Sequence, residues 1–158
     1  MRAIVIGVGN EYRGDDAAGL IVARTLKSKN LSSLKIIEAS GEGASLLEAW
    51  KDSDLVIVVD ASCSGAKAGT VARFDAHKQT IPAEFFRYST HAFSVAEAIE
   101  LARAIEQLPP HLIIYAIEGK NFAAGNGISS EVENVVGNVI ERVLCDLREF
   151  GQSRSKRT

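Results

Sequence analysis

The sequence is poor in cysteine: Cys63 and Cys145 are its only two, and they lie far outside the spacing of a Cys-x-x-Cys pair. This excludes a framework of disulfides and a cysteine-rich zinc site. It is typical of a reducing compartment, so we expect a cytoplasmic location. The chain also lacks long apolar runs near its start. Ala3–Val8 is too short for the core of a signal peptide or for a membrane span.

An excess of one charge is also missing, because 18 Lys and Arg residues face 20 Asp and Glu residues, for a net charge of −2. Surfaces that bind nucleic acids or anionic membranes need a clear positive excess, so we expect neither partner. With 158 residues, 46% of them hydrophobic, the chain is long enough for one domain. We assign residues 1–150 to that domain, which we expect to be a monomer. Residues 151–158 are polar, basic and without periodicity, which predicts a disordered tail.

Short segments rich in Val and Ile alternate with segments of helical periodicity. The predicted strands are Ala3–Val8, Leu34–Ala39, Leu55–Asp60, Thr70–Phe74 and Leu112–Ile117. The first, third and fifth lack polar alternation, as do parallel strands buried on both faces. No helical pattern precedes Thr70–Phe74, so we expect it to be an antiparallel strand at the sheet edge. The sequence therefore predicts an α/β fold, a three-layer sandwich around a twisted, mostly parallel five-stranded sheet.

Apolar residues at helical spacing predict helices in the intervening segments, and two serines mark helix starts. The predicted helices are Ala18–Leu26, Gly43–Trp50, Val95–Ile105 and Val132–Leu147. Ser94 with Glu97, and Ser130 with Glu133, have the spacing of a capping box.

A glycine-rich turn, GVGNEYRGDDAAG at residues 7–19, links the first strand to the first helix. A dinucleotide-binding Gly-x-Gly-x-x-Gly motif would need glycine where Tyr12 stands. The adjacent carboxylates of Asp15 and Asp16 would also repel a pyrophosphate. An acid at a helix start commonly caps the helix, and one aspartate is enough for that. The other is a candidate for binding or catalysis.

Two further candidates fall on the same predicted edge of the sheet. Asp60 follows the apolar run Leu55–Val59, at the carboxyl end of a central strand, where α/β proteins bind ligands. His91 lies in the loop that enters the helix at Ser94. Taken singly, a turn cap explains Asp60 and simple solvation explains His91. Together, Asp16, Asp60 and His91 offer two oxygens and one nitrogen, a set that suits nickel or zinc with open coordination positions.

At these residues the sequence resembles the hydrogenase maturation proteases, the endopeptidases that trim the large-subunit precursor of NiFe hydrogenases. The opening GVGNEYRGDDAAG is similar to the family's GxGNxxxxDDxxG signature, VVDA around Asp60 to its central-strand aspartate, and STHAFS around His91 to its histidine loop. AIEGKNFAAGNGISSEVENVV resembles the segment between the family's last strand and final helix. The resemblance spans residues 2–148 and implies a phosphorylase/hydrolase-like fold.

The resemblance also implies a mechanism. Asp16, Asp60 and His91 would contact nickel that the precursor already carries, so the free protein would bind the metal weakly. One peptide bond near the precursor's C-terminus would be hydrolysed, with Asp16 or Glu38 as the catalytic carboxylate. Glu38 stands where the family has an aspartate in a DxGTxG-like segment, and EASGEG, at residues 38–43, has no clear counterpart of that threonine.

Three other functions are open from the sequence. A Cys/His hydrolase would use Cys63 or a nearby serine, with His91 as base and Asp60 to orient it, but the chain has no Gly-x-Ser-x-Gly elbow. Peptidyl-tRNA hydrolases share the early GxGN, yet Asp15 and Asp16 would oppose a polyanion. The last is a non-catalytic module that senses nickel in a partner.

Overall fold

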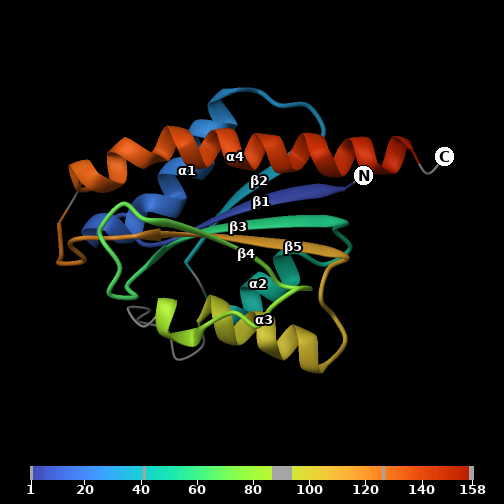
Figure 1. Cartoon of the computed structure of the whole chain (residues 1–158), viewed down its shortest axis with the longest axis horizontal. Coiled ribbons are helices and arrows are strands. Elements are labelled where there is room, and N and C mark those ends of the chain that lie inside the picture. The colour runs from blue at the N-terminus through green and yellow to red at the C-terminus, as the bar shows by residue number, and fades with distance from the viewer. Residues whose placement is uncertain (1, 41, 87–93, 126, 157–158) are drawn as a thin grey trace.

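The computed structural model describes residues 2–40, 42–86, 94–125 and 127–156, and within them a central sheet separates two layers of helices (Figure 1). The strands are Ala3–Val8 (β1), Leu34–Ala39 (β2), Leu55–Ser62 (β3), Val71–Asp75 (β4) and His111–Glu118 (β5). The α-helices are Ala18–Ser28 (α1), Gly43–Ala49 (α2), Val95–Ala104 (α3) and Ser130–Ser155 (α4), and the 3-10 turns are Gly14–Ala17 (η1) and Ala83–Phe86 (η2). No helix among these residues is long and apolar enough to cross a membrane.

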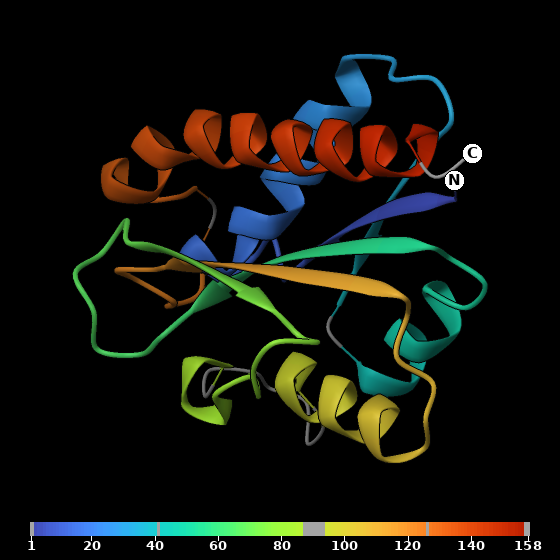
Figure 2. The same ribbon diagram turned by 45° about the vertical axis from the view of Figure 1, so that its right-hand side comes forward.

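The five-stranded sheet has the order β2-β1-β3-β5-β4. All neighbouring strands are parallel except β4, which pairs antiparallel with β5 at the edge, as predicted (Figure 2). Strand β3 is longer than predicted, because Ala61 and Ser62 still pair with Ile117 and Glu118 of β5. Asp60 therefore lies inside the strand and not at its end.

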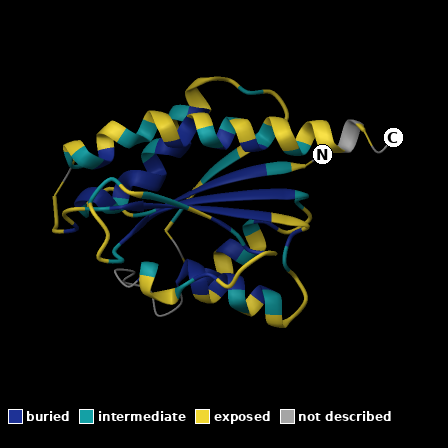
Figure 3. Ribbon diagram, in the orientation of Figure 1, coloured by how far each residue is buried: buried dark blue, intermediate teal, exposed yellow. Residues whose placement is uncertain are grey.

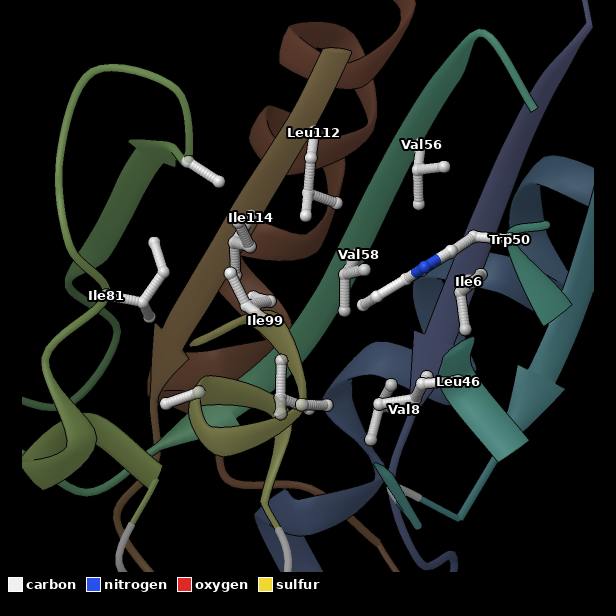
Figure 4. Packing of buried hydrophobic residues seen from close by; sticks show 14 of the residues in the cluster. Ile6, Val8, Leu46, Trp50, Val56, Val58, Ile81, Ile99, Leu112 and Ile114 are labelled. Atoms are coloured by element: carbon white, nitrogen blue, oxygen red, sulfur yellow. The ribbon is translucent and has the colours of Figure 1, made fainter. Parts of the chain in front are cut away.

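The two faces of the sheet carry separate apolar clusters. Helices α1 and α4 cover one face and α2 and α3 cover the other (Figure 1). The central strands β3 and β5 are buried almost throughout, whereas the helices are exposed on their outer sides (Figure 3). On the α2 and α3 side, Trp50 packs among the aliphatic side chains of β1 and β3, and Ile99 lies near Ile114 (Figure 4). The continuous apolar strands thus fix a rigid base beneath the loops at their carboxyl ends.

Of the two predicted capping boxes, the one at the start of α3 is confirmed and the one at the start of α4 is wrong. At α3 the capping box forms as predicted: Ser94 N–H donates to Glu97 Oε2 at 3.1 Å, and Glu97 N–H donates to Ser94 Oγ at 3.4 Å. At α4 the prediction was wrong by one residue, since Val132 N–H donates to the hydroxyl of Ser129, not of Ser130. Only Ser130 has the spacing of a capping box, but Ser129 also donates to Asp15 in another loop, and this tertiary contact places it at the helix start.

Helix α4 continues to Ser155, so the predicted disordered tail is wrong for residues 151–155. Extending a helix that already exists costs much less than starting one. The hydroxyl of Ser153 also donates to the carbonyl of Glu149 at 3.0 Å, within the helix. A long helix can therefore continue for several residues past the last apolar position of its sequence pattern.

Gly19 of α1 is expected to tolerate no side chain. A Cβ there would overlap the carbonyl oxygens of Val59 and Val8, so the helix backbone lies directly on the sheet. We expect Gly19→Ala to lower the free energy of unfolding by about 1–3 kcal/mol. The matched control is Gly137→Ala in α4, where a Cβ has nothing within 4 Å. That change is expected to raise stability by up to about 1 kcal/mol, because alanine favours the helix. Urea unfolding of both variants tests the opposite signs.

Candidate active site

A cavity of about 390 Å³ opens at the carboxyl ends of β1, β2 and β3. Parallel strands bring these ends to one edge of the sheet, which is where ligands bind in such folds. Its charged lining residues are Glu11, Asp16, Arg24, Glu38 and Asp60. Its aromatic lining residues are Tyr12, Phe85, Phe86 and Phe122. The lining of the cavity is therefore mostly acidic in its charged residues and rich in aromatic residues.

Asp16 enters this cavity from the 3-10 turn η1, between β1 and α1. The turn is pressed against the end of β1, since a Cβ on Gly9 would overlap the carbonyl oxygen of Asp16. Gly9 N–H also donates to the carbonyl of Ala39 at 3.0 Å, which ties the same loop to β2. The glycine-rich turn thus holds Asp16 by close backbone contact with β1 and β2.

Asp60 reaches the same cavity from β3, and only 8% of the residue is exposed. Burial raises the pKa of the Asp60 carboxyl well above its ordinary value, and the nearby negative charge of Asp16 raises it further. The N–H of Ala61, which donates to Asp60 Oδ1 at 2.8 Å, partly offsets both effects. The structure therefore brings together two of the three predicted metal-contacting residues.

His91, the third, lies outside the described residues. The chain has three histidines. The ring of His77 contacts the carbonyl of Pro109 at 2.7 Å, and the ring of His111 packs against Phe150. Neither residue lines the cavity.

Asp15 and Asp16 are adjacent but serve different parts of the molecule. The Asp15 side chain is fully buried and accepts four hydrogen bonds from a distant loop: from N–H of Lys120 (2.7 Å), Asn121 (3.1 Å) and Ser129 (2.6 Å), and from the Ser129 hydroxyl (2.8 Å). Burial alone would raise the pKa of Asp15, but these hydrogen bonds outweigh it and hold the pKa below its ordinary value. The sequence predicts a cap for one aspartate of the pair, and Asp16 is the one in the predicted metal set, which leaves the turn or a cap to Asp15. It has a structural role, but its partners lie in the loop before α4.

Glu38, the other predicted catalytic carboxylate, lies at the cavity wall beside two cations. Arg24 Nε donates to Glu38 Oε1 at 2.9 Å, and Lys27 Nζ lies 3.7 Å from Glu38 Oε2. Arg24 also approaches Glu11 at 3.4 Å. The guanidinium thus links the carboxyl end of β2 to the glycine-rich loop.

Sequence reasoning did not select several of the lining residues. Arg24 sits on the predicted helix after Asp16, and its only signal was a charge on an otherwise amphipathic helix. Phe85, Phe86 and Phe122 come from loops whose positions depend on the whole fold. Cys63, considered only as a nucleophile, is half-buried and also lines the cavity.

Comparison with known proteins gives one consistent result. The family model described as hydrogenase maturation protease matches residues 21–146, a stretch that contains Glu38, Asp60 and His91. The hydrogenase 2 maturation protease of Escherichia coli is 27% identical over 155 residues, with 96% of this chain and 93% of the relative covered. A putative hydrogenase maturation protease of Methanocaldococcus jannaschii is 29% identical, with 92% and 96% covered.

The fold agrees with that of a solved relative. The solution structure of an endopeptidase from Escherichia coli superposes with a TM-score of 0.82 at 26% identity, and covers 96% of this chain and 94% of that one. This agreement extends over the strands that carry the cavity. The chain therefore belongs to the hydrogenase maturation protease family and is an endopeptidase.

Proposed function

We propose that this endopeptidase removes a C-terminal extension from the nickel-loaded large-subunit precursor of a NiFe hydrogenase, acting in the cytoplasm as a monomer. The observation that carries the proposal is the convergence of Asp16 and Asp60 on one cavity at the sheet edge. Carboxylate oxygens with an imidazole suit a divalent ion, and His91 would supply the imidazole. The ion belongs to the substrate, so the three side chains would recognise a loaded precursor by contacting its nickel.

The proposed chemistry is hydrolysis of one peptide bond that nickel holds in place. Contacts of the ion with Asp16, Asp60 and His91 would fix the scissile segment, and such fixation is worth up to about 7–11 kcal/mol of the barrier. The ion would also polarise the carbonyl or acidify a bound water. Water attacks the carbonyl carbon and gives its proton to a carboxylate, Asp16 or Glu38. The carbon–nitrogen bond then breaks, and the proton passes to the departing amine.

The test compares purified precursor with and without nickel. We expect the loaded precursor to be shortened, and the nickel-free precursor to be cut at least about tenfold more slowly, because fixation through the ion is lost. Mass spectrometry of the precursor after incubation measures both rates. Equal rates would contradict recognition through nickel. A stable complex with an uncut, loaded precursor would indicate the non-catalytic nickel-sensing module instead.

Cys63 provides a test against the Cys/His hydrolase. Its thiol lies at the cavity, so its position alone does not exclude nucleophilic attack. We expect Cys63→Ala to keep the cleavage rate within about threefold, because the metal-assisted route forms no covalent intermediate. Cys145→Ala, at an exposed position on α4, is the matched control. Loss of activity in Cys63→Ala alone would assign the reaction to the thiol.

A further inference from the structure

Strand β2 is an edge of the sheet, and one side of its backbone faces away from β1. The carbonyl of Ala39 accepts from Gly9 N–H, so the backbone groups of Ala39 point toward β1. Successive residues of a strand alternate in direction, so the N–H and C=O groups of Ile36 and Glu38 point outward. Within the described ranges, neither residue has a backbone hydrogen bond on that side. Such groups are a template for another strand.

The outward side of β2 leads directly to the cavity. Glu38 and Ala39, at the end of the strand, line the cavity, and so does Ser40. The opposite edge strand, β4, contributes no lining residue within the described part of the chain. A peptide lying along β2 would therefore arrive at the cavity wall formed by Glu38 and Ala39, and its continuation across the ends of β2 and β1 would approach Asp16 and Asp60. A peptide along β4 would end beside no residue of the cavity within the described part of the chain.

We propose that β2 binds the C-terminal segment of the precursor as an added sixth strand, which carries the scissile bond into the cavity. This inference rests on the proposed function. An endopeptidase must hold chain on both sides of the bond that it cuts, and pairing with an edge strand holds a peptide extended through main-chain hydrogen bonds. Because β2 ends at the cavity, a strand added to it is expected to be the substrate and not a second copy of the chain.

The side chains of β2 indicate which kind of segment fits. Ile36 and Ile37 are only partly buried, and they pack against the apolar clusters on opposite faces of the sheet. An added strand would cover the rest of both side chains if it had apolar residues at adjacent positions, one on each face. The exposed Lys35 and the paired Glu38 offer both signs of charge nearby. Main-chain pairing with two apolar contacts, and not a charge pattern, is the expected mode of recognition.

The test uses proline at the outward positions of the two edges. Ile36→Pro removes an outward N–H from β2. On β4 the carbonyl of Thr70 accepts from Glu118 N–H of β5, so the neighbouring Val71 points outward, and Val71→Pro removes its N–H. Ile36→Ala shortens the side chain but keeps the N–H. With nickel-loaded precursor as substrate, we expect Ile36→Pro to raise KM at least tenfold. We expect Val71→Pro to leave KM unchanged, and Ile36→Ala to lie closer to the wild type than Ile36→Pro. Urea unfolding confirms that each variant folds.

A second measurement covers the case in which Ile36→Pro does not fold. Pulsed hydrogen exchange on the wild-type chain, mixed with loaded precursor, should slow at the amides of Ile36 and Glu38 at least tenfold and remain unchanged at Val71 and Arg73. If the wild type cuts the precursor while exchange at Ile36 and Glu38 and the KM of a folded Ile36→Pro variant are both unchanged, the edge inference fails and the proposed function stands. If the wild type does not cut, the proposed function fails. Slowed exchange at Ile36 and Glu38 would then still establish binding at the edge, and unchanged exchange would overturn it.

Discussion

Asp16→Asn and Asp60→Asn are each expected to slow precursor cleavage by about a hundredfold or more while the fold is kept. Each change removes one charged oxygen ligand for the ion, and loss even of a group that only supports a metal ligand costs 10- to 100-fold in general. The measurement is the rate of shortening of loaded precursor under single-turnover conditions. Retention of full activity in both variants would exclude the two carboxylates from the reaction.

The stability of Asp60→Asn separates a functional carboxylate from a structural one. Burial and the charge of Asp16 raise the pKa of Asp60. Ionisation of this carboxyl at neutral pH therefore lowers the free energy of unfolding. The wild type should therefore gain stability as the pH falls toward that raised pKa. Asparagine removes the charge, so Asp60→Asn should unfold at higher urea than the wild type at pH 8. A large loss of stability would instead assign Asp60 a structural role.

The carboxylates of this site show which of its features the sequence could predict and which it could not. The uninterrupted apolar strands set the sheet, and parallel strands place their carboxyl ends together, so Asp60 and the turn with Asp16 were predictable from pattern alone. The contacts that hold Asp15 away from the cavity were not, because they come from Ser129 and Lys120, more than a hundred positions away in the chain. Periodicity carries no information on such contacts.

The same limit applies to the walls of the cavity and to the ends of elements. Arg24 approaches Glu38 only because α1 packs against β1, β2 and β3 together, which no local pattern encodes. Phe122 lies at the cavity because its loop is tied to Asp15, and a Cβ on Gly119 would overlap its ring. Strand β3 passes Asp60 because β5 still pairs with it there. Local sequence thus predicts which elements exist, and tertiary contacts decide where they end and what they surround.

Asp15→Asn is expected to lower the free energy of unfolding by about 3 kcal/mol at neutral pH, the largest stability effect among the site residues. The four donors around Asp15 all point at its carboxylate, and an amide would turn an N–H group toward at least one of them. The loop before α4 would lose its anchor, and with it the backing of the turn that carries Asp16. The control is Asp52→Asn, an exposed aspartate with a φ of 63°, a conformation that asparagine also adopts. It should change stability by no more than about 0.5 kcal/mol.

The pH dependence of this effect follows from the lowered pKa of Asp15 in the folded state. A carboxyl group whose pKa is lowered by folding stabilises the protein above its unfolded pKa, about 3.9 for aspartate. That contribution is lost as the pH falls through the lower folded value. The difference in unfolding free energy between the wild type and Asp15→Asn should therefore be constant from pH 5 to 7 and shrink below about pH 4. Urea unfolding at pH 7, 5 and 3 measures it, and a difference that grew on acidification would contradict an ionised, hydrogen-bonded Asp15. Because Asp15 and Asp60 shift in opposite directions, the two asparagine variants should also depart from the wild type with opposite signs at pH 8.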